Sequence, residues 1–180
     1  MAVTETSPAG PPDRWGDGLV AELRWVHDMI RRDLETVRRM ASEVSAGLPS
    51  EDVRAGIRSL AASGPLWQLK INCLHYCRFV HSHHHVESIM LFPELRRANP
   101  ALGPVVDKLE ADHASVSGLL DEVEAAAQAL SGRDDPALRE RLTGALQKLS
   151  TDLLAHLRYE EESISDTLRT LAARTGGPGW

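Results

Sequence analysis

Residues 77–95 read CRFVHSHHHVESIMLFPEL, and the chain is interpreted outward from this stretch. Five of the eight histidines of the protein lie between His75 and His85. His83 and Glu87 are four residues apart, so on an α-helix, which turns about 100° per residue, their side chains lie about 40° apart. The stretch therefore predicts a helix that presents an imidazole and a carboxylate on one face.

Apolar residues recur at spacings of three and four along four long segments, the pattern of amphipathic helices. The segment with the quoted stretch runs from Pro65 to about Ala98, and the others begin near Leu19, after Pro104 and near Ala137. No segment alternates apolar and polar residues with a period of two, which is the pattern of a half-buried strand. The sequence predicts an all-α fold, an up-down four-helix bundle.

Two local signals refine this bundle. Pro93 falls inside the second long helix and predicts a kink there. Ser50 precedes Glu51 and forms an N-cap signal for a short extra helix that ends around Gly64, between the first two long helices. The predicted domain organisation is a flexible N-terminal arm at 1–16, the bundle at 17–172 and a frayed C-terminal tail at 173–180.

Composition excludes several classes of protein. With 20 Lys and Arg against 26 Asp and Glu in 180 residues, the net charge is −6, which disfavours nucleic acid and anionic membranes as partners. No apolar stretch approaches the roughly 20 residues of a membrane span, and the N-terminus does not resemble a signal peptide. Cys73 and Cys77 form no disulfide framework, so a soluble protein of the reducing cytoplasm is predicted.

Each long helix places a histidine on the face that its apolar residues assign to the core, and two of these histidines have a glutamate four residues later. The histidines are His27, His83, His113 and His156, and the glutamates are Glu87 and Glu160. Burying so many polar groups costs several kcal/mol unless each finds a partner. Imidazoles with carboxylates suit iron, manganese or zinc rather than calcium, and two carboxylates able to bridge favour two metal ions. The alternative is a metal-free interaction bundle.

The order of these residues resembles the hemerythrin-like, or HHE cation-binding, family, whose signature is H…HxxxE…H…HxxxE. The quoted stretch is similar to that family's second helix, where the metal-binding pair precedes a Leu-Phe-Pro segment. The resemblance covers about residues 17–170. It implies a four-helix bundle around a non-haem di-iron centre that meets O2, peroxide or nitric oxide. The implied terminal ligands are His27, His83, His113 and His156, and the implied bridging ligands are Glu87 and Glu160.

The third helix departs from the pattern of the classical oxygen-carrying hemerythrins, which have a His-x-x-x-His pair there. Leu109 and Ser117 stand four residues to either side of His113. Either Glu110 fills the gap, or one metal keeps an open, water-filled position. This departure leaves simple reversible O2 carriage in doubt.

The fourth helix leaves a choice between neighbouring carboxylates. The classical spacing of His-x4-Asp would select Glu161, but regular helix geometry puts Glu160 about 40° and Glu161 about 140° from His156. We predict Glu160 as the ligand, and a π-bulge in this helix would reverse the choice.

Other polar residues near the second helix have open roles. His84 lies about 100° from His83 and either partners the site or reaches a substrate channel, whereas His81 and His85 lie about 160° away and are predicted to face solvent. Tyr76, two turns before His83, hydrogen-bonds into the site, supplies electrons, or packs as an ordinary core tyrosine.

These observations lead to a function with stated alternatives. The favoured hypothesis is a non-haem di-iron oxidoreductase that binds and reduces or activates O2, peroxide or nitric oxide, with two iron ions as cofactor and manganese not excluded. The alternatives are an O2- or iron-binding or sensing module without turnover, and a biosynthetic oxidase acting on a small organic molecule. The predicted assembly is a monomer or a homodimer.

Overall fold

The computed structural model describes residues 14–46, 65–130 and 135–175, and every regular element within them is helical. The α-helices are α1 (Arg14–Ser45), α3 (Pro65–Val86), α4 (Phe92–Ala98), α5 (Gly103–Ala129) and α6 (Pro136–Thr175). A π-helical turn, η1 (Glu87–Leu91), joins α3 to α4, and a short 3-10 turn, η2 (Pro100–Leu102), precedes α5. Among the described helices, none is both long enough and apolar enough to cross a bilayer.

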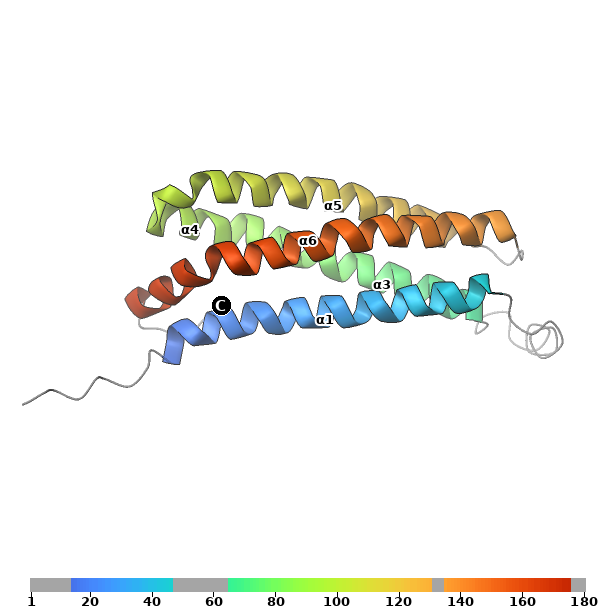
Figure 1. The fold of residues 1–180 in the computed structure, drawn as a ribbon, viewed down its shortest axis with the longest axis horizontal. Coiled ribbons are helices and arrows are strands. Elements are labelled where there is room, and N and C mark those ends of the chain that lie inside the picture. Colours follow the sequence, from blue (N-terminus) through green and yellow to red (C-terminus); the bar gives the residue numbers. More distant parts are fainter. Residues whose placement is uncertain (1–13, 47–64, 131–134, 176–180) are drawn as a thin grey trace, which may run out of the picture.

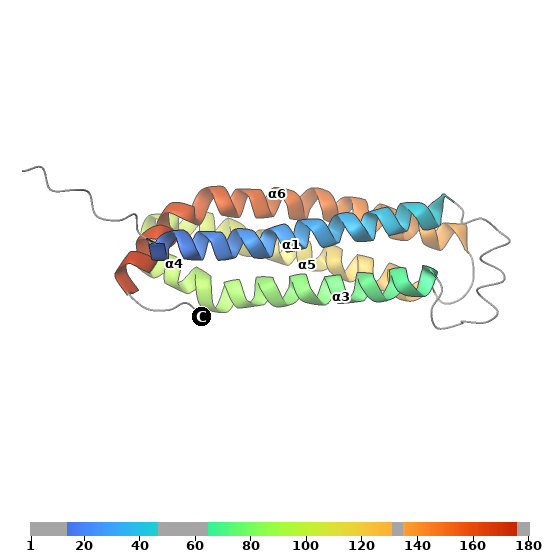
Figure 2. The same cartoon turned by 90° about the horizontal axis from the view of Figure 1, so that it is seen from below.

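The four long helices run antiparallel to their neighbours in an up-down bundle (Figures 1 and 2). Helix α1 contacts α6 and α3, and α5 contacts the same two helices from the other side. Helix α4 continues the direction of α3 and packs on α5 and α6. The predicted four-helix bundle is confirmed, and the short helix predicted at 50–64 lies outside the described residues.

The helix boundaries follow local capping chemistry. Helix α6 begins at Pro136, and the side chain of Asp135 accepts a hydrogen bond from the amide of Ala137 at 2.9 Å. At the opposite end of the bundle, the side chain of Asn99 accepts from the amide of Ala101 at 3.2 Å. Helix α1 begins at Arg14, inside the predicted arm, and α6 reaches three residues into the predicted tail.

Two apolar clusters fill the bundle and leave a polar layer between them. The α4-side cluster consists of Val20, Leu23, Phe92, Leu95, Val106, Leu109, Ile164 and Leu168. The long cluster occupies the rest of the bundle, with core positions within 30–41 of α1, 69–80 of α3, 116–127 of α5 and 142–157 of α6, and with Leu130 just after α5. The buried polar side chains His27, Glu87, His113 and Glu160 fall between these two clusters along their helices.

The second long helix is altered just before Pro93. A kink was predicted there, and the structure has the π-helical turn η1, in which the amide of Phe92 donates to the carbonyl of Glu87. Proline has no N–H to donate, and in a regular α-helix its ring crowds the carbonyl four residues earlier. A wider turn relieves this crowding, and it also sets where Glu87 and Ser88 point.

Candidate metal centre

The polar layer gathers seven ionisable side chains from all four long segments. They are His27 of α1, His83 and His84 of α3, Glu87 at the start of η1, His113 of α5, and His156 and Glu160 of α6. All are buried except His83, whose side chain is 10% exposed. The structure therefore brings together all six ligand candidates of the sequence motif, and His84 joins them as a seventh residue.

Glu87 lies at the middle of this group. Its Oε1 atom is 3.2 Å from Nε2 of His83 and 3.9 Å from Nε2 of His27. Its Oε2 atom is 3.5 Å from Nε2 of His113. The two oxygens of one carboxylate thus face imidazoles of three different helices, Oε1 toward α1 and α3 and Oε2 toward α5, an arrangement suited to a ligand shared by two cations.

Glu160 has a similar position on α6. Its Oε2 atom lies 3.5 Å from Nε2 of His27 and 3.6 Å from Nε2 of His156. Donor atoms bound to one ion at about 2.1 Å are separated by about 3.0 to 3.4 Å, so these spacings are close to those of a coordination shell. Glu161 does not share this position, because its Oε1 atom lies on the outer side of His27.

The donor atoms of the layer have no hydrogen-bond partners among the described residues. Nε2 of all five histidines and both oxygens of the two glutamates are buried and make no hydrogen bond with any described residue. Nδ1 of His156 and the hydroxyl of Tyr76 complete the set of such atoms. Because native proteins leave very few buried polar groups unsatisfied, the Nε2 atoms and carboxyl oxygens gathered in this layer indicate a ligand that binds them.

Burial holds the imidazoles in their neutral form. Desolvation is the largest cause that lowers the pKa of His27, His83 and His113 from 6.5 to about 3, and that of His156 to about 4. The pKa of His84 is lowered for the same reason. At neutral pH each ring therefore keeps a lone pair that it can offer to a cation.

Burial acts on the carboxyls in the opposite direction. Desolvation raises the pKa of Glu160 from 4.5 to about 8, and the charge of Glu161 adds to the shift. The pKa of Glu87 is raised well above 4.5 by desolvation and by the nearby charge of Glu160. Both carboxyls therefore hold their protons more tightly than an exposed glutamate does, and a bound cation would take the place of those protons.

Outer partners orient several of the rings. Nδ1 of His27 lies 2.8 Å from Oε1 of Glu161, which Nη2 of Arg31 also reaches at 2.8 Å. A carboxylate only accepts, so Nδ1 of His27 donates and its Nε2 keeps the lone pair. Nδ1 of His113 lies 3.0 Å from Oγ of Ser88, in the π-helical turn. These contacts turn the free nitrogens toward the centre of the layer.

His84 belongs to the cluster. Its ring stacks on that of His113 with 4.1 Å between the ring centroids, and it meets the ring of His156 edge-on at 5.1 Å. One nitrogen from each of these three rings lies within 4.8 Å of the others. The other end of the layer combines His27 and His83 with Glu87 within the same limit. The layer therefore has a three-imidazole end and a two-imidazole end.

Two further candidates lie elsewhere. The side chain of Glu110 points to the surface, where its Oε2 atom is 3.0 Å from Nη2 of Arg96, so it does not reach the gap beside His113. Tyr76 is buried in the long apolar cluster. Burial also raises the pKa of its hydroxyl well above 10. His84, rather than Glu110, occupies the place beside His113.

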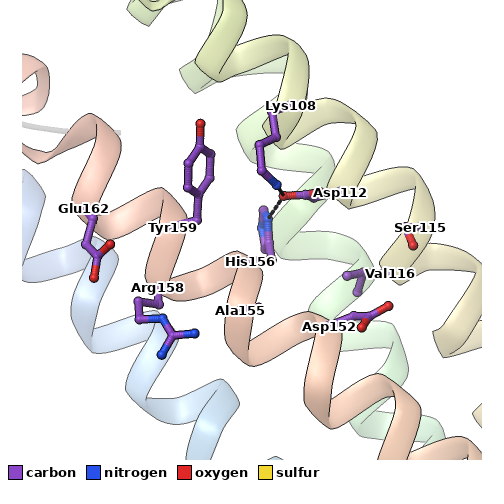
Figure 3. A pocket seen from close by; sticks show the side chains of 10 residues that line it. All are labelled: Lys108, Asp112, Ser115, Val116, Asp152, Ala155, His156, Arg158, Tyr159 and Glu162. Carbon is purple, nitrogen blue, oxygen red and sulfur yellow. Dashed lines mark hydrogen bonds and ion pairs between the residues drawn. The ribbon is translucent and has the colours of Figure 1, made fainter.

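Two pockets adjoin the three-imidazole end. The first, of about 420 Å³, lies between α5 and α6 and is drawn in Figure 3. There Asp112 stands between Lys108 and His156, with its Oδ2 atom 3.8 Å from Nδ1 of His156. The second, of about 430 Å³, lies between α3 and α5 and reaches His84 and His113. Both pockets thus border histidines of the polar layer.

Comparison with known proteins agrees with this geometry. The family model described as the hemerythrin HHE cation-binding domain matches residues 18–168 of the chain. No curated protein and no solved structure matched the chain. The matched range includes every residue of the polar layer.

Proposed function

The chain belongs to the hemerythrin HHE cation-binding family and is a metal-binding helical module, and on that premise we propose that it binds two iron ions. At this centre the protein binds and reduces or activates O2, peroxide or nitric oxide. The pair of ions, when bound, supplies the electrons for this chemistry. The protein itself holds the ions, orients the rings and limits access of solvent.

One observation carries the proposal. Nε2 of five histidines and all four oxygens of Glu87 and Glu160 converge, buried and without hydrogen-bond partners among the described residues. A single ion would use only part of this set, because structural and catalytic sites for such metals take about four to six donors. Two ions that share both carboxylates use all of it.

The division of the donors supports a chemical asymmetry. His84, His113 and His156 would hold one ion, His27 with His83 would hold the other, and the two glutamates would be available to both. The second ion would then have fewer protein ligands and could accept a small exogenous ligand. Iron is favoured over zinc because the family resemblance implies redox chemistry, and manganese has the same ligand preferences.

A second candidate function has its own support. The sequence motif alone provides four histidines, and the absence of a fifth argued against reversible O2 carriage. The position of His84 against His113 and His156 supplies that fifth imidazole. Reversible binding of O2 without turnover is therefore the alternative that this geometry favours.

A titration with three ligands separates these functions. The full chain, loaded with ferrous iron without oxygen, is mixed in turn with O2, peroxide and nitric oxide while the visible absorption is recorded. Consumption of the ligand over many cycles with a reductant supports the oxidoreductase. An O2 adduct that reverses under vacuum supports the carrier, and no spectral change with any ligand overturns the proposal.

Two variants show that the signal comes from the polar layer. His156→Ala removes a ligand candidate and should abolish the spectral changes. His75→Ala removes an exposed histidine of α3 and should leave them unchanged. Equal loss in both variants would mean that the signal does not report on this centre.

The proposed location is the cytoplasm. Cys73 and Cys77 are free and fully buried. Burial raises the pKa of each thiol to about 12, so both stay protonated and inert. Free buried thiols suit a reducing compartment.

A further inference from the structure

His156 differs from the other histidines of the polar layer at its outer ring nitrogen. Among the described residues, it is the only histidine whose two ring nitrogens are both buried and without a hydrogen-bond partner. Nδ1 of His27, by contrast, is held by Glu161, and Nδ1 of His113 is held by Ser88. A neutral imidazole that binds a cation through Nε2 carries its proton on Nδ1, so His156 needs an acceptor on its outer side.

Asp112 of α5 is the carboxylate that faces this nitrogen. Its Oδ2 atom lies 3.8 Å from Nδ1 of His156, which is longer than a hydrogen bond. The same oxygen is 2.5 Å from Nζ of Lys108, one turn earlier on α5, so Asp112 stands between the two nitrogens in Figure 3. The side chain of Asp112 is 27% exposed and lines the pocket of about 420 Å³, which leaves it space to turn toward His156.

Lys108 is held beside Asp112 by a second contact. Its Nζ atom lies 4.5 Å from the centroid of the ring of Tyr159, which follows His156 by three residues on α6. A cation over the face of an aromatic ring is attracted to it, so α5 and α6 together keep Lys108 in place. Because this positive charge is bound to Oδ2 of Asp112, it weakens the attraction of that oxygen for the N–H group of His156.

The opposite end of the polar layer has a similar arrangement at a shorter distance. Nδ1 of His27 lies 2.8 Å from Oε1 of Glu161, and Nη2 of Arg31 reaches the same oxygen at 2.8 Å. In both places one carboxylate oxygen lies between the outer nitrogen of a histidine and a basic side chain. At His27 the hydrogen bond to the ring is made, whereas at His156 the carboxylate of Asp112 lies closer to the basic side chain.

We propose that Asp112 is a positioning residue that orients His156 toward the bound cation, and that Lys108 limits this effect by holding the same carboxylate oxygen. A carboxylate that accepts the outer N–H of a ligating histidine fixes the ring and its tautomer and makes Nε2 a stronger donor. Removal of Lys108 should therefore free Oδ2 for His156 and strengthen metal binding. This inference rests on the proposed function, since it takes the polar layer to be the metal centre.

The test compares how tightly the metal-free full chain and its variants bind cobalt(II), whose visible absorption reports binding to the protein. Asp112→Asn should weaken binding about ten-fold, the lower end of the effects seen when an outer partner of a ligand is changed. Lys108→Gln should strengthen binding several-fold. Both changes should shift the cobalt absorption, because the ring of His156 turns, and the number of ions bound at saturation should stay at the wild-type value.

Two exposed residues of the same pocket provide matched controls. Asp152→Asn and Arg158→Gln remove the same charges as the two test variants. Among the described residues, no hydrogen bond or ion pair joins Asp152 or Arg158 to Asp112 or His156, so both controls should bind cobalt as the wild type does. Effects as large in the controls as in Asp112→Asn and Lys108→Gln would mean that only local charge matters, and would overturn the proposal.

The double variant D112N/K108Q separates the contact from a general effect of charge. Because Lys108 acts through Asp112, adding K108Q to D112N should change the affinity little, whereas two independent effects would add. Additive effects, or an unchanged affinity in D112N, would overturn the positioning role and leave the metal centre itself intact. Failure of the wild type to bind cobalt would overturn the metal centre and the positioning role together.

Discussion

The polar layer and the long apolar cluster occupy equivalent core positions of the same four helices, and they follow opposite energetic rules. In the long cluster, side chains such as Leu120 and Leu149 are fully buried and stabilise the fold by leaving water. In the polar layer, Glu160 is just as buried, yet its two oxygens have no hydrogen-bond partner among the described residues. Apolar burial therefore folds the bundle, whereas the polar layer destabilises it until cations bind.

The largest expected effect comes from removing a shared ligand of the polar layer. Glu160→Gln keeps the volume of the side chain but replaces the carboxyl, which can lose its proton to bind a cation, with an amide that cannot. The variant should lose most of its bound metal and gain almost no stability from added iron. The wild type should gain about 4 kcal/mol when free cation exceeds the dissociation constant 1,000-fold. Thermal unfolding with and without chelator measures both.

The matched change in the long cluster should have the reverse signature. Leu120→Ala should reduce the free energy of unfolding by about 2 to 5 kcal/mol, because it removes buried methyl groups and leaves a cavity. The number of metal ions per chain should stay the same. Loss of metal in this variant with normal stability would contradict the separation of the two regions.

The pH dependence of the metal-free protein should come from the polar layer. The pKa of His27, His83 and His113 is lowered to about 3 in the folded protein. Below pH 6.5 the unfolded chain therefore takes up protons that the folded chain does not, and the free energy of unfolding decreases as the pH is lowered from 6.5 to about 3. The pKa of Glu160 is raised to about 8, so stability also falls as pH rises from 4.5 to 8.

Because more histidines than glutamates contribute, the acid loss dominates below pH 6, and the metal-free protein should be most stable near neutral pH. Bound cations hold the carboxylates in their charged form, so loading should remove the alkaline loss. Melting temperatures measured from pH 5 to pH 9, with and without metal, test this. Identical profiles for the two forms would contradict the assignment.

Outer partners of the rings should have smaller effects. Glu161→Gln removes the charge that holds Nδ1 of His27, and metal affinity should fall about 10- to 100-fold. Glu162→Gln changes an exposed neighbour on the same helix and is the control. Isothermal titration with cobalt(II) compares them, and equal affinities in the two variants would show that Glu161 does not orient the ring.

The smallest effect is expected at the π-helical turn. Pro93→Ala restores an amide at residue 93 and allows the turn to relax toward an α-helix, which would move Ser88 away from Nδ1 of His113. Metal affinity should fall several-fold, with a shift in the cobalt absorption. Pro104→Ala, in the first turn of α5, is the control. An unchanged spectrum in Pro93→Ala would mean that the turn does not depend on this proline.

The helix starts could largely be predicted from the proline and capping residues in the sequence. Pro65 was predicted to open the second long helix and does so in the structure, and Pro136 directly precedes the predicted start of the fourth. Proline and capping residues mark helix starts because their effects are local. A kink was predicted at Pro93, and the structure has a π-helical turn directly before it; the form of this irregularity could not be predicted, since the sequence does not show how a chain relieves the crowding around a proline.

The candidate site was harder to predict in full. The convergence of the motif histidines could be predicted, because apolar periodicity identifies the face of each helix that packs in the core. His84 lies about 100° from His83 on a helix, and that angle alone does not decide whether it faces the core. Measured from the buried Val80, His83 and His84 lie about 60° and 40° to either side, so both reach the core. Glu110 was placed near the gap by spacing alone, and its pairing with Arg96 depends on tertiary structure.

The most direct test of the central claim is the number of ferrous ions that the full chain binds tightly without oxygen. Two bridging carboxylates and five imidazoles predict about two ions per chain. His84→Ala should lower this number, and His75→Ala should leave it at the wild-type value. One ion per chain, or none, would contradict the account of a two-metal centre built from the polar layer.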